Sequence, residues 1–148
     1  MRFKPTRLVW VGLLACHVAM AAPSVTAEVT VGAGSLDLDG EGSSGTYIVK
    51  VADVTFSTDN PVGCTLTVTS GGITKTGGQD IAYQVTSVED GAPAPSSGDF
   101  TVPSGNEYTY SIESPDTSYR DIYVKYKTQV SQDPGTYNET VYFSVADN

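Results

Sequence analysis

The stretch Cys64-Thr65-Leu66-Thr67-Val68-Thr69 alternates apolar and polar side chains without a break. The same period of two recurs over residues 122–127, Ile-Tyr-Val-Lys-Tyr-Lys, and over residues 141–145, Val-Tyr-Phe-Ser-Val. Successive side chains of a strand point to opposite faces, so this alternation places one face on a core and the other in water. No window carries apolar residues at helical spacing over the length that a helix needs. The pattern predicts an all-β fold.

Turn-forming residues separate the alternating runs, among them Asn60-Pro61-Val62-Gly63 and Asp133-Pro134-Gly135. Many short strands with turn signals roughly every 8–12 residues are typical of a sandwich or a barrel. The chain shows no internal repeat and no linker long enough to divide it. We therefore expect one antiparallel immunoglobulin-like β-sandwich over residues 28–148. Its strands should lie near residues 28–32, 35–38, 46–57, 64–70, 72–76, 80–88, 106–113, 119–130 and 136–146.

Side chains at the inward-facing positions of these strands should form the core. Cys64 lies within an alternating strand, which favours a small buried hydrophobe over a reactive thiol or an intermolecular disulfide. Tyr137 follows the spacing Asp-x-Gly-x-Tyr over residues 133–137, which is typical of a tyrosine corner and so of a structural role. We expect the core to contain Val49, Val51, Val54, Phe56, Cys64, Leu66, Val68, Ile81, Tyr83, Val85, Ile112, Ile122, Val124, Tyr126, Val141, Phe143 and Val145.

Residues 1–27 have the pattern of a secretory signal peptide. Basic residues in the first seven positions precede an apolar run over residues 8–22, and Val25-Thr26-Ala27 supplies small residues at a cleavage site. A membrane-spanning helix needs about 20 apolar residues, more than this run supplies. We expect cleavage after Ala27, so that residues 28–148 form the β domain of a protein that is secreted, periplasmic or held at the cell surface.

An alternative is that the protein carries a lipid anchor. Leu13-Leu14-Ala15-Cys16 is similar to the lipobox before the acylated cysteine of bacterial lipoproteins. The apolar core before Cys16 is short, and residues 18–22 remain apolar where lipoprotein tethers are usually polar. We therefore favour a cleaved signal peptide, and expect no membrane insertion unless Cys16 is lipidated.

After residue 27 the chain keeps five basic residues against seventeen acidic ones, a formal net charge of −12, and it has no histidine or tryptophan. Negative charge of this size repels nucleic acid and anionic membranes. Without imidazole the usual general base is missing, and no serine or cysteine lies in a nucleophile elbow. A single remaining cysteine, Cys64, excludes a His/Cys metal site. We expect a non-enzymatic protein with no cofactor and no nucleic-acid partner.

Two groups of tyrosine and lysine residues are candidates for partner binding. Tyr123, Lys125 and Lys127 alternate along one expected strand, and Tyr108 and Tyr110 share one face of another. Exposed aromatic residues anchor interfaces, so these positions could bind a glycan or a protein. The alternative is ordinary cross-strand pairing, because tyrosine and lysine also stabilise sheets and protect exposed edges. We favour the structural interpretation.

Three acidic residues are weak calcium candidates. Asp37, Asp39 and Glu41 occupy the first, third and fifth positions of a turn that ends in glycine, which is the start of an EF-hand spacing. That motif also needs a glutamate at its twelfth position, where this chain has Ile48. A solvated acidic turn is the favoured interpretation, and we expect no bound metal.

Two segments carry a resemblance to known families. Residues 135–145, Gly-Thr-Tyr-Asn-Glu-Thr-Val-Tyr-Phe-Ser-Val, resemble the last strand of bacterial surface β-sandwich proteins, namely WxL-type wall proteins and spore coat protein U-like, pilin-like domains. Residues 54–68 are similar to a strand-turn-strand segment of the same secreted domains. The resemblance implies a bacterial surface protein and a β-sandwich fold.

These observations lead to two expectations of function. The first is a secreted surface or pilus-like structural protein that acts through adhesion or assembly, with itself or with a partner on the cell surface. Strand addition at a sheet edge would join the copies, with the segment Glu28 to Leu38 as the donor strand. The alternative is a carbohydrate-binding module that uses the tyrosine faces.

Overall fold

The structure is a computed structural model that describes residues 21–33, 44–69, 71–130 and 136–148. Within these ranges the chain forms seven strands and one short 3-10 helix, Ser97–Asp99, and no helix is long and apolar enough to cross a membrane. The expected all-β fold is confirmed. The strands are β1 Ser24–Val29, β2 Thr46–Thr58, β3 Cys64–Thr69, β4 Tyr83–Glu89, β5 Tyr108–Ile112, β6 Asp116–Lys127 and β7 Tyr142–Asp147.

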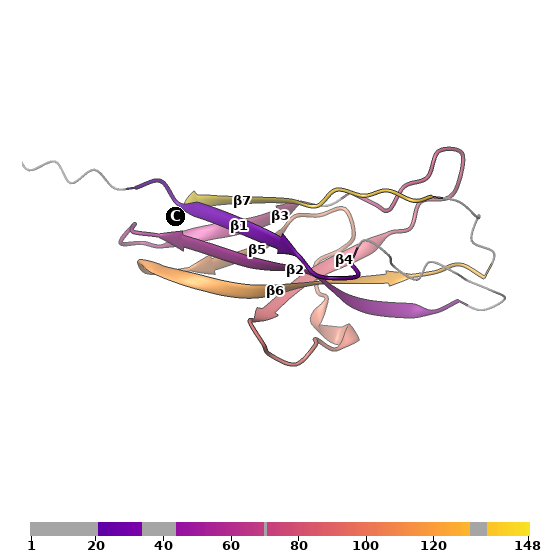
Figure 1. Cartoon of the computed structure of the whole chain (residues 1–148), viewed down its shortest axis with the longest axis horizontal. Coiled ribbons are helices and arrows are strands. Elements are labelled where there is room, and N and C mark those ends of the chain that lie inside the picture. Colours follow the sequence, from indigo (N-terminus) through magenta and orange to yellow (C-terminus); the bar gives the residue numbers. More distant parts are fainter. Residues whose placement is uncertain (1–20, 34–43, 70, 131–135) are drawn as a thin grey trace, which may run out of the picture.

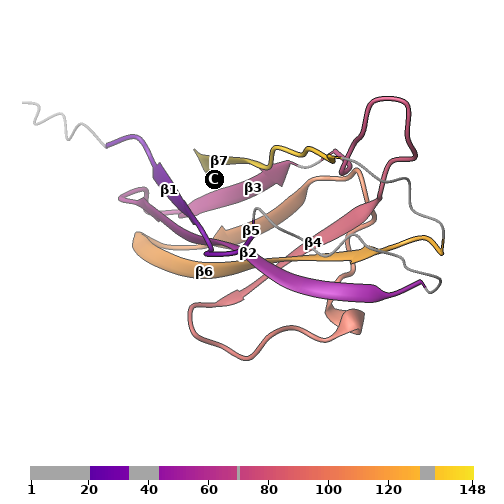
Figure 2. The same ribbon diagram turned by 45° about the vertical axis from the view of Figure 1, so that its right-hand side comes forward.

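The strands form two antiparallel sheets (Figure 1). The larger sheet has the order β1-β2-β6-β4 and the smaller sheet has the order β5-β3-β7. The sheets face each other, and β1 at the edge of the larger sheet lies beside β7 at the edge of the smaller one (Figures 1 and 2). Strands β2 and β6 form the long central pair, whose register shifts between Lys50 and Ala52. Such a shift is a β-bulge, in which one extra residue bends the strand.

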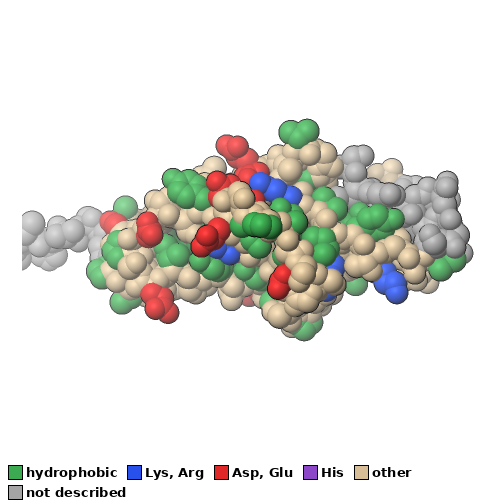
Figure 3. All heavy atoms as spheres, turned by 90° about the horizontal axis from the view of Figure 1, so that it is seen from below, with side chains coloured by type: hydrophobic (Ala, Val, Ile, Leu, Met, Phe, Trp, Pro, Cys, Tyr) green, Lys and Arg blue, Asp and Glu red, His purple; other side chains and the backbone are tan. Residues whose placement is uncertain are grey.

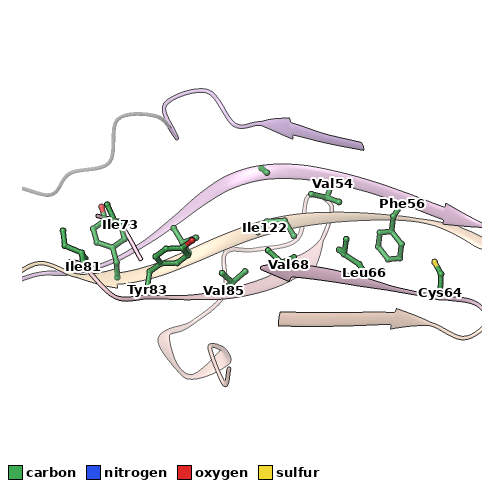
Figure 4. Packing of buried hydrophobic residues seen from close by; sticks show 13 residues of the cluster. Val54, Phe56, Cys64, Leu66, Val68, Ile73, Ile81, Tyr83, Val85 and Ile122 are labelled. Atoms are coloured by element: carbon green, nitrogen blue, oxygen red, sulfur yellow. The ribbon is translucent and has the colours of Figure 1, made fainter. Parts of the chain in front are cut away.

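The core lies between the two sheets. Phe56 of β2, Leu66 of β3 and Ile122 of β6 are fully buried and point into this layer (Figure 4). Every residue that we expect in the core belongs to the same hydrophobic cluster. Ala52 and Ile73 are also buried there, although the alternating pattern does not single them out. Six of the expected residues are only partly buried and pack against the buried ones; they are Val49, Val51, Ile112, Val141, Phe143 and Val145.

Several strand boundaries differ from the expected ones. Strand β1 begins at Ser24, inside the segment assigned to the signal peptide, and residues 35–38 lie outside the described residues. Residues 72–76 and 80–82 form isolated bridges rather than strands. The last strand begins at Tyr142 instead of residue 136, because β3 ends at Thr69, opposite Tyr142. Before that point the chain bridges to Thr74 through Asn138 instead.

Candidate functional site

Tyr108 and Tyr110 of β5 extend from the smaller sheet toward the larger one. The Tyr108 hydroxyl lies 2.8 Å from Oγ of Ser87 in β4. The Tyr110 ring meets the Phe56 ring edge to face, at 6.2 Å between centroids. Both tyrosines are half-buried, and their contacts connect β5 to the opposite sheet. They do not form an exposed aromatic face.

A buried arginine completes this contact between the sheets. The Arg120 guanidinium lies 4.0 Å from the centre of the Tyr110 ring, a cation–π arrangement. It also donates hydrogen bonds from Nε to Ser87 Oγ at 3.1 Å and from Nη2 to the Ser87 carbonyl oxygen at 3.0 Å. Burying a charged group without partners is costly. Tyr110 and Ser87 supply those partners, and Arg120 forms no ion pair with a carboxylate in the described part of the chain.

The other candidate group, which comprises Tyr123, Lys125 and Lys127, lies on the outer face of β6. Its members differ in exposure. Tyr123 is only 9% exposed, so the prediction that it faces solvent is wrong. Lys125 is half-buried; its ammonium group donates to the Ser97 carbonyl oxygen at 2.9 Å and lies 5.0 Å from the centre of the Phe100 ring. Lys127 is exposed. The group is therefore not a continuous contact surface.

Residues 90–105 explain why Tyr123 is buried. This segment crosses the outer face of β4 and β6. Gln84 of β4 donates hydrogen bonds to the carbonyl oxygens of Phe100 and Val102, and Phe100 itself is buried. Thr86, which lies opposite Tyr123 in β4, donates to the carbonyl oxygen of Asp99. An outward position on β6 is therefore covered by chain rather than by water.

An ion-pair cluster occupies the outer face of the larger sheet. Lys50 Nζ lies 2.6 Å from Asp53 Oδ1 and 2.8 Å from Asp121 Oδ1. The Asp121 side chain is 3% exposed, and its other oxygen accepts a hydrogen bond from the Gly91 backbone N–H at 3.2 Å. Asp121 Oδ1 accepts no well-directed hydrogen bond within the described residues, so its contact with Lys50 is an ion pair. Figure 3 shows acidic and basic side chains side by side near the centre of one face.

The cluster shifts the pKa values of Asp121 and Lys50. Burial acts to raise the pKa of the Asp121 carboxyl, but the contacts with Lys50 and with the Gly91 N–H outweigh it, so the pKa lies below its ordinary value. The contacts with Asp121 and then with Asp53 raise the pKa of the Lys50 ammonium above its ordinary value. Lys50 and Asp121 are therefore both charged at neutral pH, and the Lys50 ammonium lies against the opposed carboxylates of Asp53 and Asp121.

The same cluster has the spacing of a metal site. Carboxylate oxygens of Asp53, Asp90 and Asp121 lie within 4.8 Å of one another. The Lys50 ammonium already contacts two of these carboxylates, so the cluster contains its own cation. We interpret it as an ion-pair network. The weak calcium candidates from the sequence lie outside the described residues; they are Asp37, Asp39 and Glu41.

An apolar groove of about 370 Å³ opens between the two sheets. Two polar side chains meet there, where the Tyr83 hydroxyl donates to Glu139 Oε1 at 2.9 Å. The groove reaches buried core positions on β2 and β6, and it lies where edge strand β1 approaches the segment leading into β7. Its apolar lining includes Val29, Val51, Ala52, Val124, Val141 and Phe143.

Neither the cluster nor the groove is predicted by the sequence pattern. Strict alternation would place Lys50 and Asp53 on opposite faces of β2, but the bulge between Lys50 and Ala52 brings them to the same face. Asp121 joins them only through the register of β6 against β2. The one sequence feature that indicates the bulge is Val51, an extra apolar residue in the alternating pattern of β2. Comparison with protein-family models and with curated protein sequences finds no match for this chain.

Proposed function

We propose that this chain is an exported, non-enzymatic β-sandwich protein of the cell surface or periplasm that works by associating with further copies of itself. One observation carries the proposal. The edge strand β1 lies beside an apolar groove and continues into a segment whose apolar side chains are exposed. The signal-peptide pattern of the leader supports export, and the lack of histidine after residue 17 supports a non-enzymatic role.

The proposed architecture is immunoglobulin-like in its layers. Four strands face three, as strands ABED face CFG in an immunoglobulin constant domain. The order along the chain differs from that domain in two ways. The fifth and sixth strands are exchanged between the two sheets, and the third strand is the central strand of the smaller sheet. A sandwich of this kind leaves four edges, two on each sheet, at which another strand can pair.

Strand β1, at one edge of the larger sheet, has the side-chain pattern of an exchangeable strand. From Val25 to Val31 the chain alternates apolar residues with threonine and glutamate. Val25 packs against the core, but Val29 is 77% exposed and Val31 is fully exposed. An edge strand with uncovered apolar side chains is prone to pair with another chain. Burying one such valine against a partner contributes about 1.5–3 kcal/mol.

We infer that the copies are joined by exchange of β1. The strand pairs with β2 from Ser24 opposite Ser57 to Val29 opposite Ala52. The same register can form when β1 comes from a second copy, and an exchanged element keeps the contacts that it makes within one chain. This strand overlaps the donor segment Glu28 to Leu38 expected from the sequence, of which Leu36 and Leu38 lie outside the described residues.

A disulfide trap tests this proposal. Oγ of Ser24 lies 2.9 Å from Oγ of Ser57, so the double variant Ser24→Cys/Ser57→Cys should form a disulfide across the β1–β2 pair. If β1 is exchanged, oxidation of concentrated protein gives covalent dimers and larger species on a non-reducing gel. The matched control is Thr65→Cys/Ser111→Cys between β3 and β5, where the oxygens lie 2.7 Å apart, and it should stay monomeric.

Light scattering at increasing concentration completes the test. The net charge of −12 after residue 27 opposes association, and salt screens that repulsion. The associated fraction should therefore rise between low and physiological ionic strength. A protein that stays monomeric at high concentration in both buffers contradicts self-association. Non-covalent oligomers in which the Ser24/Ser57 disulfide forms only within one chain contradict the exchange of β1.

A further inference from the structure

Strand β1 extends across the cleavage site expected after Ala27. Ser24 pairs with Ser57 and Val25 with Phe56, and the strand runs on through Ala27 to Val29. The Val25 side chain packs against the hydrophobic cluster, and the hydroxyls of Ser24 and Ser57 are in contact at 2.9 Å. Residues before position 28 are therefore part of the larger sheet.

Cleavage after Ala27 would remove most of this strand. Only Glu28 and Val29 would remain of its six residues. The stretch Val54–Ser57 of β2 would lose its partner and become the edge of the sheet. The fully buried Phe56 would also lose the cover of the strand that carries Val25. The exported domain would then begin with an incomplete sheet.

The sequence contains a second small-x-small site. Ala19-Met20-Ala21 lies at the end of the apolar run over residues 8–22, where a signal peptidase recognises its substrate. The site that ends at Ala27 lies five residues beyond that run.

We propose that the leader is removed after Ala21, so that the exported protein begins at Ala22 and keeps all of β1. This inference rests on the proposed export. Cleavage precedes folding during export, so β1 does not shield the later site. The position relative to the apolar run selects the earlier site, and a cut there leaves the whole of β1 in the exported protein. The cut removes one exposed contact, the hydrogen bond from the Ala21 N–H to Asp59 Oδ2.

Intact mass spectrometry and N-terminal sequencing of the exported protein test the proposal. The full chain is expressed with its own leader in a bacterial host and purified from the periplasm and the medium. We expect residues 22–148. A product of residues 28–148 overturns the proposal but leaves export standing, whereas an uncleaved chain overturns export itself. A product that begins at an acylated Cys16 overturns the Ala21 site and establishes a lipid anchor.

Two matched variants separate the sites. Ala21→Leu removes the small residue before the proposed cut, and Ala27→Leu removes the one before the later site. We expect Ala21→Leu to abolish the product that begins at Ala22, and Ala27→Leu to leave its N-terminus unchanged. The reverse pattern overturns the proposal. Because residues 22–148 keep the whole of β1, they should melt at a higher temperature than residues 28–148. Equal melting temperatures would contradict the structural argument for the earlier site.

Discussion

Replacing Lys50 by methionine should destabilise the protein by about 3 kcal/mol. The change leaves two carboxylates facing each other, since Asp53 of β2 is the direct partner of Asp121 in β6. Removing one member of a buried ion pair costs about 3–5 kcal/mol, because the remaining charge is buried without compensation. The Asp121 side chain is 3% exposed, but Lys50 is 27% exposed and Asp53 is nearly half exposed. Water screens part of the interaction, which places the loss at the low end of that range.

Urea denaturation followed by circular dichroism measures the loss. Lys127→Met is the matched control, because Lys127 is an exposed lysine in the same sheet and its replacement should change the free energy of unfolding by less than about 0.5 kcal/mol. The double variant Lys50→Met/Asp121→Asn should recover most of the lost stability. It removes the uncompensated charge, and the asparagine oxygen can still accept the hydrogen bond from the Gly91 N–H.

The pH dependence gives a second measure of the same interaction. The pKa of Asp121 is lowered in the folded protein, so its contribution is present above the ordinary value of 3.8 and is lost as the pH falls through the lowered pKa. The pKa of Lys50 is raised, so its contribution is present below 10.5 and is lost as the pH rises through the raised pKa. The difference between wild type and Lys50→Met should be constant near neutral pH and shrink in acid. A loss under about 1 kcal/mol at pH 7, or a difference that persists when Asp121 is protonated, refutes the reasoning.

Three further predictions address the core and the contact between the sheets. Phe56→Ala should lower the free energy of unfolding by about 3–5 kcal/mol in urea melts. Phe143→Ala, at a half-buried position in the groove wall, should lower it by only about 1–2 kcal/mol. Equal losses in the two variants would contradict the different burial of the two rings. Arg120→Met should lower the melting temperature and Arg120→Lys should not restore it, because only a guanidinium has the planar fork that stacks on Tyr110 while donating to two acceptors. Cys64 should react slowly with a thiol reagent in the native protein and quickly in urea, because it is fully buried and burial, then the nearby Asp147, raises the pKa of its thiol. Rapid labelling of the native protein would contradict its position in the core.

The fold and the core could be predicted because they depend on a local pattern. The period of two in β3, β6 and β7 identifies the inward side chains, and all those expected in the core belong to one cluster. Alternation tells which face a residue occupies but not what covers that face. Tyr123 shows the difference, since it lies on the outer face of β6 as expected and is buried by residues 90–105. The prediction of an exposed aromatic position failed for that reason.

The outer-face cluster could not be predicted because it depends on two features without a local sequence signal. One is the bulge in β2, which brings Lys50 and Asp53 to the same face. The other is the pairing of Asp53 with Asp121, two residues far apart in the chain. Two like charges in direct opposition destabilise a sheet unless a cation separates them. The bulge supplies that cation by placing the Lys50 ammonium between them. The irregularity in β2 and the register of β6 are thus parts of one electrostatic arrangement, because the register opposes two carboxylates and the bulge brings the ammonium group that contacts both.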